Sequence, residues 1–264
     1  MATHADHGSN DGSGQLHSGL SYALTVNSTV SFVIPAWNEE AQLPSTLDAV
    51  HGAGRAASLS FEVLVADDAS TDGTADVARA HGAIVVPCNN RQIAATRNAG
   101  ARASTGEILI FVDADTRPRP ETVRGVVDAI SNGATYGGAD VEWDCKLSLI
   151  SRVLLRSTLN FYRRAKLASG AFLFCTRDAF NQTGGFDESL FAAEEYYFSR
   201  ALGRIGRHAW VKHRVVTSGR KLRTYSDWEL LRETLRLMLR GKKGLRTRAG
   251  LDLWYGHRRP DPMD

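Results

Sequence analysis

The architecture of this 264-residue chain follows from one segment, Glu107-Ile108-Leu109-Ile110-Phe111-Val112-Asp113-Ala114-Asp115-Thr116. Its apolar run has the short length and the composition of a strand that is buried on both faces. Two aspartates follow where such a strand would leave the sheet, and open α/β sheets bind their ligands at that edge. Alternate residues of an extended chain share a side, so Asp113 and Asp115 are predicted to face one point. Two carboxylates placed in this way suit Mg²⁺ together with substrate phosphates.

The composition is that of a soluble globular protein, with 43% hydrophobic and 23% charged residues. No apolar run reaches the roughly 18 residues of a membrane-spanning helix. The first residues do not have the pattern of a secretory signal, a basic segment followed by an apolar core. Cys88, Cys145 and Cys175 are too few and too widely spaced for a disulfide framework or a zinc site. These features predict a cytoplasmic protein in a reducing compartment.

Charge is distributed unevenly along the chain. From Arg200 onward there are 17 Lys and Arg against 6 Asp and Glu, whereas the residues up to Ser199 hold 15 against 23. A basic C-terminal part indicates an anionic partner, such as phosphates, nucleic acid or a lipid surface. Nucleic acid is the weakest of these, because aromatic and basic residues do not alternate on one predicted sheet face.

The order of predicted elements indicates an α/β fold. Residues 1–28 are rich in Gly, Ser, His, Asp and Asn and are predicted to form a disordered tail. Strands are then predicted to alternate with helices, which implies βαβ units and a Rossmann-like, mainly parallel sheet with flanking helices. Right-handed crossovers place the loops that follow the strands on one edge. The loops after Ile34, Ala66 and Val112 are therefore expected to line one crevice.

Two later helices are rich in arginine. Helical periodicity predicts the first over residues 147–166, where four arginines form a solvated basic face or, as a secondary alternative, a phosphate site; they are Arg152, Arg156, Arg163 and Arg164. The second begins at Ser226, with Trp228, Leu235 and Leu239 at helical spacing beside Arg232 and Arg236. This basic amphipathic helix could lie on an anionic membrane surface, pack on the domain or mediate self-association into a homo-oligomer.

Five separated segments resemble the family-two glycosyltransferases of GT-A fold, and the similarity extends over about 30–223. They are Ile34-Pro35-Ala36-Trp37-Asn38-Glu39-Glu40, Asp67-Asp68-Ala69-Ser70-Thr71-Asp72-Gly73-Thr74, Thr96-Arg97-Asn98-Ala99-Gly100-Ala101, Asp113-Ala114-Asp115 and Gly184-Gly185-Phe186-Asp187-Glu188. The resemblance implies one GT-A domain over 29–225, with a nucleotide-sugar-binding half over 29–118 and an acceptor half over 119–225. The basic C-terminal helix and tail then occupy 226–264.

The resemblance also implies how a donor such as a UDP- or GDP-sugar would be held. The base and ribose would contact residues of the first two motifs, namely Pro35, Ala36, Asn38, Glu39 and Asp68. Arg91 and Arg97 would approach the nucleotide. Asp113 would lie near the ribose and the metal, and Asp115 would ligate Mn²⁺ or Mg²⁺ between the two phosphates. A basic turn over 217–223 would close over the diphosphate through Arg220 and Lys221, where negative charge develops.

In the acceptor half, the resemblance assigns catalysis to the acidic pair Glu194-Glu195. The second acid, usually Asp in the family and Glu here, would take the proton of an acceptor hydroxyl, which general-base catalysis requires within about 3 Å. Direct attack by that hydroxyl inverts the anomeric centre. A competing interpretation is that two acids simply stabilise a helix N-terminus. The processive Gln-x-x-Arg-Trp motif is missing, so a single transfer is expected, with peripheral binding at the inner membrane face to reach a lipid-linked or cell-envelope acceptor.

Two other functions remain as alternatives. A sugar-nucleotide nucleotidyltransferase would need a Gly-rich phosphate loop near the first strand, and Pro35-Ala36-Trp37-Asn38 offers none. A catalytically degenerate nucleotide-binding or membrane-scaffold protein is compatible with the Glu at position 195. The acidic residues present at the other motif positions favour the enzyme.

Overall fold

The computed structural model describes Met1 and residues 29–239, 241–251 and 255–256. The predicted disordered tail, apart from Met1, therefore lies outside the described residues. The described chain forms an eight-stranded sheet in the order β3-β2-β1-β4-β7-β6-β8-β5. Its strands are β1 (Val30–Ala36), β2 (Phe61–Asp68), β3 (Ile84–Cys88), β4 (Ile108–Val112), β5 (Thr116–Arg117), β6 (Tyr136–Trp143), β7 (Phe172–Thr176) and β8 (His208–Thr217).

The sheet changes character at β4. From β3 to β4 all neighbours are parallel, as predicted, and Val33 of β1 lies between Leu64 of β2 and Phe111 of β4. β7 is antiparallel to both β4 and β6, β8 is parallel to β6, and β5 is antiparallel to β8. The predicted α/β sheet is confirmed, with a parallel first half and a mixed second half. Apolar periodicity identifies a strand but not its direction, which is why the antiparallel pairs were not foreseen.

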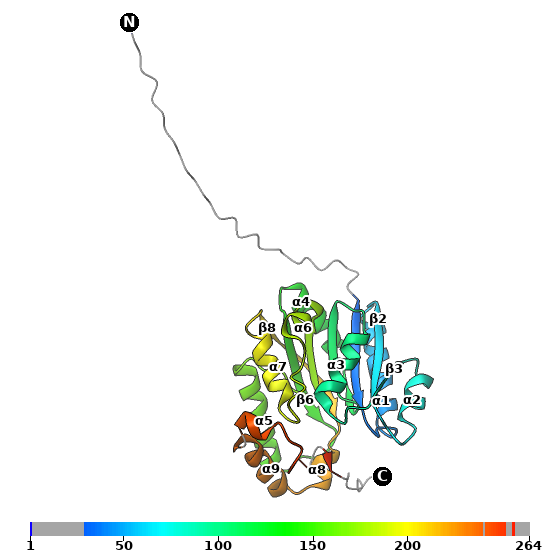
Figure 1. Cartoon of the computed structure of the whole chain (residues 1–264), viewed down its shortest axis with the longest axis vertical. Helices are drawn as coiled ribbons and strands as arrows, with labels where there is room; N and C mark the ends of the chain where they lie inside the picture. The colour runs from blue at the N-terminus through cyan, green and yellow to red at the C-terminus, as the bar shows by residue number, and fades with distance from the viewer. Residues whose placement is uncertain (2–28, 240, 252–254, 257–264) are drawn as a thin grey trace.

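Helices cover both faces of the sheet (Figure 1). One face carries α1 (Leu43–Ala56), α2 (Thr74–Ala80) and α4 (Pro120–Ser131), and the other carries α3 (Ile93–Ala103), α6 (Arg177–Thr183) and α7 (Glu194–Leu202). The remaining helices gather near one end of the sheet in Figure 1. They are α5 (Leu149–Arg164), α8 (Arg220–Thr224), α9 (Asp227–Leu239) and α10 (Gly241–Gly244).

The central strand explains why its apolar run is continuous. Ile108, Ile110 and Val112 of β4 pack into the core beneath α1 and α4, whereas Leu109 and Phe111 pack into the core beneath α3, α6 and α7. All five side chains are at most 1% exposed. Burial of each such side chain contributes about 1.5–3 kcal/mol, so β4 anchors both helical layers.

β4 ends at Val112, earlier than the sequence suggests. Ala114 and Asp115 form a turn, so the prediction of extended chain through both aspartates is wrong. The turn is held from both sides, because Thr46 Oγ1 donates to the carbonyl of Ala114 at 2.8 Å and Ser218 N donates to that of Asp115 at 3.0 Å. The chain then continues into β5, which pairs with β8.

The C-terminal helix packs only in part on the domain. Asp227 begins α9 and accepts hydrogen bonds from Ser148 and Ser151 at the start of α5, at 2.6 and 2.5 Å. Leu237 packs against a small cluster made of Leu190, Ala192, Leu245 and Leu251. The prediction of a helix beginning near Ser226 is thus confirmed, although Arg240 and most of the residues after Leu251 lie outside the described part. No described helix is long and apolar enough to span a bilayer.

Candidate active site

The two aspartates that follow β4 form the acidic centre of the candidate site. Both are partly buried, and the charges of Asp113 and Glu39 reach Asp115. Burial, followed by these two charges, raises the pKa of Asp115 to about 6, while Lys221 and Arg220 act in the opposite direction. The turn, rather than an extended strand, thus brings the two carboxylates together.

This pair fits a divalent cation. Within the described residues, no group of three or more His, Cys, Asp and Glu side chains is placed to hold a metal. Mg²⁺ nevertheless commonly binds to only one or two protein carboxylates, and substrate phosphates and water then complete its coordination shell. Burial and the neighbouring negative charges raise the pKa of Asp115, and a bound cation would act in the opposite direction. We conclude that the donor set suits a metal bound together with a diphosphate.

Glu39 and α8 are far apart in the sequence, and both lie next to the two aspartates. An ion pair of 3.5 Å joins Arg220 to Glu39, and the two side chains are 18% and 11% exposed. The predicted basic turn is in part a short helix, which begins at Arg220 and includes Lys221. Asp144 fixes its start by accepting hydrogen bonds from Gly219 N at 2.7 Å and from Arg223 at 3.2 Å. Asp144 lies in no recognised motif, so no signal in the sequence pointed to this role.

The first motif forms the loop beside this centre. Pro35 and Ala36 are the buried end of β1. Asn38 adopts a left-handed backbone with φ of 51°. Its backbone N–H donates to Ser70 Oγ at 2.9 Å, and its side-chain oxygen accepts from Thr71 N at 2.8 Å. The first two motifs are therefore joined into one rim, as the shared sheet edge predicted.

Asp68 has a structural role that the sequence did not reveal. Its carboxylate accepts hydrogen bonds from the backbone N–H groups of Asn90, Arg91 and Gln92 at 2.6, 2.9 and 3.0 Å, and from Thr96 Oγ1 at 2.9 Å. The side chain is buried, so both oxygens are committed to the start of α3. Asp68 thus has partners within the chain, and its contact with the base stays a prediction.

The neighbouring residues of this rim are more accessible. Asp67 is half-buried, and its carboxylate accepts a hydrogen bond from Ser70 N at 3.2 Å. Arg91, predicted to approach the nucleotide, places its guanidinium 3.7 Å from the centre of the Trp37 ring, a cation–π contact. Asp67 is thus the acid of this motif that is better placed to meet a ligand.

Arg97 is buried and joins the two halves of the site. Its guanidinium donates to Glu194 at 2.7 Å, to Asp113 at 2.8 Å and to the carbonyl of Gly170 at 3.0 Å, and the residue is 2% exposed. The approach of Arg97 to the nucleotide stays a prediction. Its charge neutralises two carboxylates at once, Asp113 after β4 and Glu194 at the start of α7.

Two of the motifs meet at Asn98. Its side chain donates to the carbonyl of Phe186 at 2.9 Å and to Glu188 at 2.8 Å, and it accepts from Phe186 N at 2.9 Å. Gly185 has φ of 84°, and a Cβ there would lie 2.5 Å from the Asn98 side-chain oxygen. Only glycine fits this turn, which leads the chain towards α7.

The predicted acidic pair opens α7. Glu194 is buried against Arg97, while Glu195 lies beside Gly170. Burial, then the charge of Glu194, raises the pKa of Glu195 to about 8, against the lowering effect of Arg97. Burial, followed by the charges of Glu195 and Glu194, raises the pKa of the Tyr162 phenol on α5. In its ionised form, a carboxylate with a raised pKa is a stronger proton acceptor than an ordinary one.

Some buried polar atoms near the acidic pair lack partners. Within the described residues, Ser169 Oγ and Arg97 Nε are buried without a hydrogen bond. Ser169 precedes Gly170, which lies against both Arg97 and Glu195. Buried polar atoms are nearly always satisfied, so these two mark a place where a ligand can complete the hydrogen bonding.

Comparison with known proteins identifies the family of the chain. Residues 31–180 match the family model described as glycosyl transferase family 2. The glycosyltransferase AglE of Haloferax volcanii is 26% identical over 202 residues, which are 71% of this chain and 65% of AglE. An undecaprenyl-phosphate 4-deoxy-4-formamido-L-arabinose transferase of Pseudomonas paraeruginosa is 35% identical over 118 residues, 42% of this chain and 34% of that protein. The chain thus spans less than two thirds of either relative.

Solved structures confirm the GT-A fold. The mannosyltransferase PcManGT from Pyrobaculum calidifontis, solved in complex with GDP-Man and Mn²⁺, superposes with a TM-score of 0.62 at 22% identity. The match covers 88% of this chain and 73% of that one. The family match over residues 31–180 favours the glycosyltransferase prediction over the nucleotidyltransferase alternative.

Proposed function

The chain belongs to glycosyl transferase family 2, and from this premise we propose that it is an inverting, metal-dependent glycosyltransferase. It would move one sugar from a nucleotide-diphosphate donor to a hydroxyl acceptor. The observation that carries the proposal is the arrangement around Arg97, which holds Asp113 on one side and Glu194, the neighbour of Glu195, on the other.

On the donor side, Asp115 and Asp113 would hold Mn²⁺ or Mg²⁺. When bound, that ion acts as a Lewis acid for the departing nucleoside diphosphate. Arg220 and Lys221 lie close enough to influence Asp115 and add positive charge to the same place. The GDP-Man and Mn²⁺ in the PcManGT complex support a nucleotide-sugar donor with a divalent ion, and the base could be uracil or guanine.

On the acceptor side, Glu195 would take the proton of the attacking hydroxyl. A base with a pKa of about 8 is stronger than an ordinary carboxylate and is ionised over an accessible pH range. Arg97 keeps that carboxyl from an even higher pKa and fixes its neighbour Glu194. A single displacement at the anomeric carbon would then invert the configuration.

The test is sugar transfer from UDP- and GDP-sugars with and without Mn²⁺. We expect metal-dependent activity that falls by about 10²–10⁴-fold in Glu195→Gln, the usual share of a general base. Asp115→Asn should remove the metal dependence together with the activity. Asp76→Asn, an exposed acid on α2, serves as the matched control. Transfer that proceeds equally well without metal and in both site variants would contradict the proposal.

We further propose that α5 and α9 rest on an anionic membrane surface. On α5, Leu149, Ile150, Val153 and Phe161 are 58–74% exposed. On α9, Trp228, Leu235 and Leu239 are 49–86% exposed and share a face with Arg232 and Arg236. The serine contacts to Asp227 hold the two helices together at their N-terminal ends. Exposed apolar residues beside basic ones are typical of interfacial helices, and a lipid-phosphate acceptor, as in the name of one relative, would be reached from there.

Co-sedimentation with vesicles tests this second proposal. The protein should bind vesicles rich in anionic lipid, and salt should weaken binding, since each basic residue near the surface contributes about 1 kcal/mol. Trp228→Ser with Leu235→Ser should reduce binding. Ile84→Ser replaces an apolar side chain that is 52% exposed on β3 and should have no effect. Binding that is equal in both variants, or that is missing at low salt, would count against a membrane-facing surface.

A further inference from the structure

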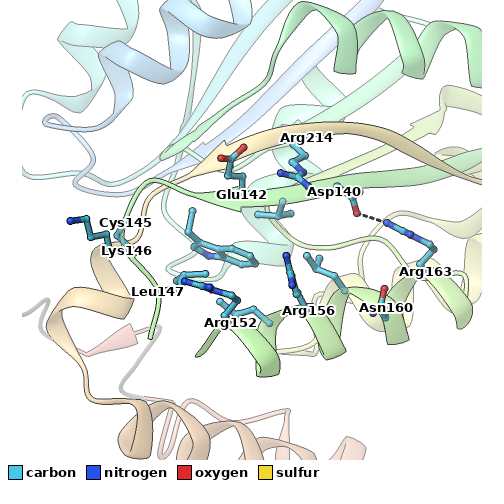
Figure 2. Close-up of a pocket in the computed structure, with 14 residues that line it drawn as sticks. Asp140, Glu142, Cys145, Lys146, Leu147, Arg152, Arg156, Asn160, Arg163 and Arg214 are labelled. Atoms are coloured by element: carbon cyan, nitrogen blue, oxygen red, sulfur yellow. Dashed lines mark hydrogen bonds and ion pairs between the residues drawn. The ribbon is translucent and has the colours of Figure 1, made fainter. Parts of the chain in front are cut away.

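A cavity of about 660 Å³ lies between α5 and the strands β6 and β8 (Figure 2). It is separate from the aspartate turn after β4. Five cationic side chains line it, and they come from three segments: Lys146, Arg152, Arg156, Arg163 and Arg214. Figure 2 shows Arg156 projecting from α5 into the space beneath the strands, with Arg214 on the strand side.

The acidic residues of the lining are already neutralised. Asp140 pairs with Arg163 at 2.7 Å and accepts a hydrogen bond from Trp210 Nε1 at 3.0 Å. Glu142 pairs with Arg119 at 3.0 Å, and in Figure 2 its carboxylate lies on the side of the strand away from α5. Neither acid therefore offers its charge to the remaining cations of the cavity.

Three arginines are left without a carboxylate. Among the described residues, no ion pair within 4.0 Å involves Arg152, Arg156 or Arg214. Arg152 and Arg156 are one helical turn apart on α5, and Arg214 lies beside Asp140 in the register of β6 and β8. All three residues are exposed, so water screens their mutual repulsion, and their planar guanidinium forks match the oxygens of a phosphate.

One end of the cavity lies near the aspartate turn of the proposed active site. Trp143, part of its lining, lies in register with Thr217, which pairs with Thr116, the residue after Asp115. Adjacent strands are about 5 Å apart, so this end of the cavity lies on the order of 10 Å from the aspartate turn.

The cavity also touches the basic segment over the donor site. Cys145, another lining residue, packs against Gly219, where a Cβ would come within 2.3 Å of its sulfur. Gly219 immediately precedes Arg220 of α8. One wall of the cavity is thus continuous with the segment that would close over the donor diphosphate.

We propose that this cavity binds the phosphate group of the acceptor, with Arg152, Arg156 and Arg214 as its ligands. The acceptor would then be a phosphate ester whose hydroxyl extends towards Glu195. That assignment to an acceptor rests on the proposed function, whereas the binding of a phosphate ester in the cavity does not. The phosphate could belong to a small soluble molecule or to a lipid headgroup, and both present the same chemistry to the arginines.

Calorimetric titration with glycerol 1-phosphate tests the proposal. The titration is done on the full chain after saturation with UDP or GDP and Mg²⁺, which blocks the donor site. We expect Arg156→Gln and Arg214→Gln each to weaken binding about tenfold or more, which corresponds to about 1.4 kcal/mol. Arg164→Gln, on the same helix but outside the lining, should stay within about twofold of the wild type. Thermal melts of all variants establish that they remain folded.

The outcomes separate this inference from the proposed function. Equal affinity in the wild type and both cavity variants, or no binding by the wild type, would overturn the phosphate site. If neither nucleotide binds but glycerol 1-phosphate still depends on Arg156 and Arg214, the donor proposal fails and the cavity assignment stands. Phosphatidylcholine vesicles that contain dodecyl phosphate, compared with dodecanol, identify the source. Stronger, Arg156-dependent binding to the phosphate-bearing vesicles than to glycerol 1-phosphate supports a lipid, and equal or weaker binding supports a soluble ester.

Discussion

Replacing Arg97 by Met removes the cation that lies between the two halves of the active site. The methionine fills much of the same volume but leaves two carboxylates without their partner. Glu194 loses a contact of 2.7 Å with only 6% of its side chain exposed, and Asp113 loses one of 2.8 Å with 33% exposed. Most of the cost therefore arises at Glu194, because water can screen much of the charge on Asp113.

Breaking a buried ion pair by removing one partner costs about 3–5 kcal/mol. Domains have a total free energy of unfolding of about 5–15 kcal/mol, so Arg97→Met should remove a large part of it. A second effect follows at Glu195, whose pKa Arg97 lowers. Without the guanidinium, this pKa should rise above about 8, and a larger fraction of the proposed base would be protonated at neutral pH.

Urea unfolding at pH 7 measures the first effect. Arg97→Met should lose about 3–5 kcal/mol, and the double variant with Glu194→Gln should recover about 1–2 kcal/mol, since it no longer buries an unpaired charge. Arg79→Met, which breaks an exposed pair with Asp76, should change stability by about 0–1 kcal/mol. A loss below about 1 kcal/mol for Arg97→Met, or no recovery in the double variant, would refute the reasoning.

The remaining predictions concern the carboxylates Glu195, Asp67, Asp68 and Asp115. The folded state raises the pKa of Glu195 from 4.5 to about 8, so its contribution to stability is present below about pH 4.5 and is lost as the pH rises to about 8. The free energy of unfolding of the wild type should therefore fall between pH 5 and 8, whereas that of Glu195→Gln should not follow it. Sugar transfer by the wild type should increase over the same range. Parallel stability curves for the two proteins would argue against a buried acid. Asp68→Ala should cost at least about 2 kcal/mol in thermal or urea unfolding, because it leaves three backbone N–H groups of the α3 start without an acceptor. Asp67→Asn should leave the free energy of unfolding nearly unchanged and weaken nucleotide binding in a thermal-shift titration. If Asp68→Ala instead weakens nucleotide binding and Asp67→Asn lowers stability, Asp68 is the residue that contacts the base. Chelation of divalent ions should abolish the stabilisation of the wild type by UDP or GDP, and Asp115→Asn should show no such stabilisation even with Mn²⁺.

The local pattern of the sequence was sufficient for the elements and for much of the site. The run from Ile108 to Val112 predicted a strand buried on both faces, and it forms β4 in the centre of the sheet. The alternation of strands and helices then required the loops after β1, β2 and β4 to meet at one edge. The contacts of Asn38 with the second motif, and the proximity of Glu39 to Asp115, follow from that rule.

The sequence by itself therefore determined which residues lie at the edge of the sheet. Only the tertiary structure decided which of them are engaged with the chain: Asp68 holds the start of α3, Arg97 joins Asp113 to Glu194, and the arginines of α5 line a cavity. The physical reason is that periodicity and motif spacing report the environment of a residue along its own element. A charge, in contrast, is satisfied by partners such as Glu194, which is 97 residues away from Arg97, and only the packing of strands and helices brings such groups within hydrogen-bond distance.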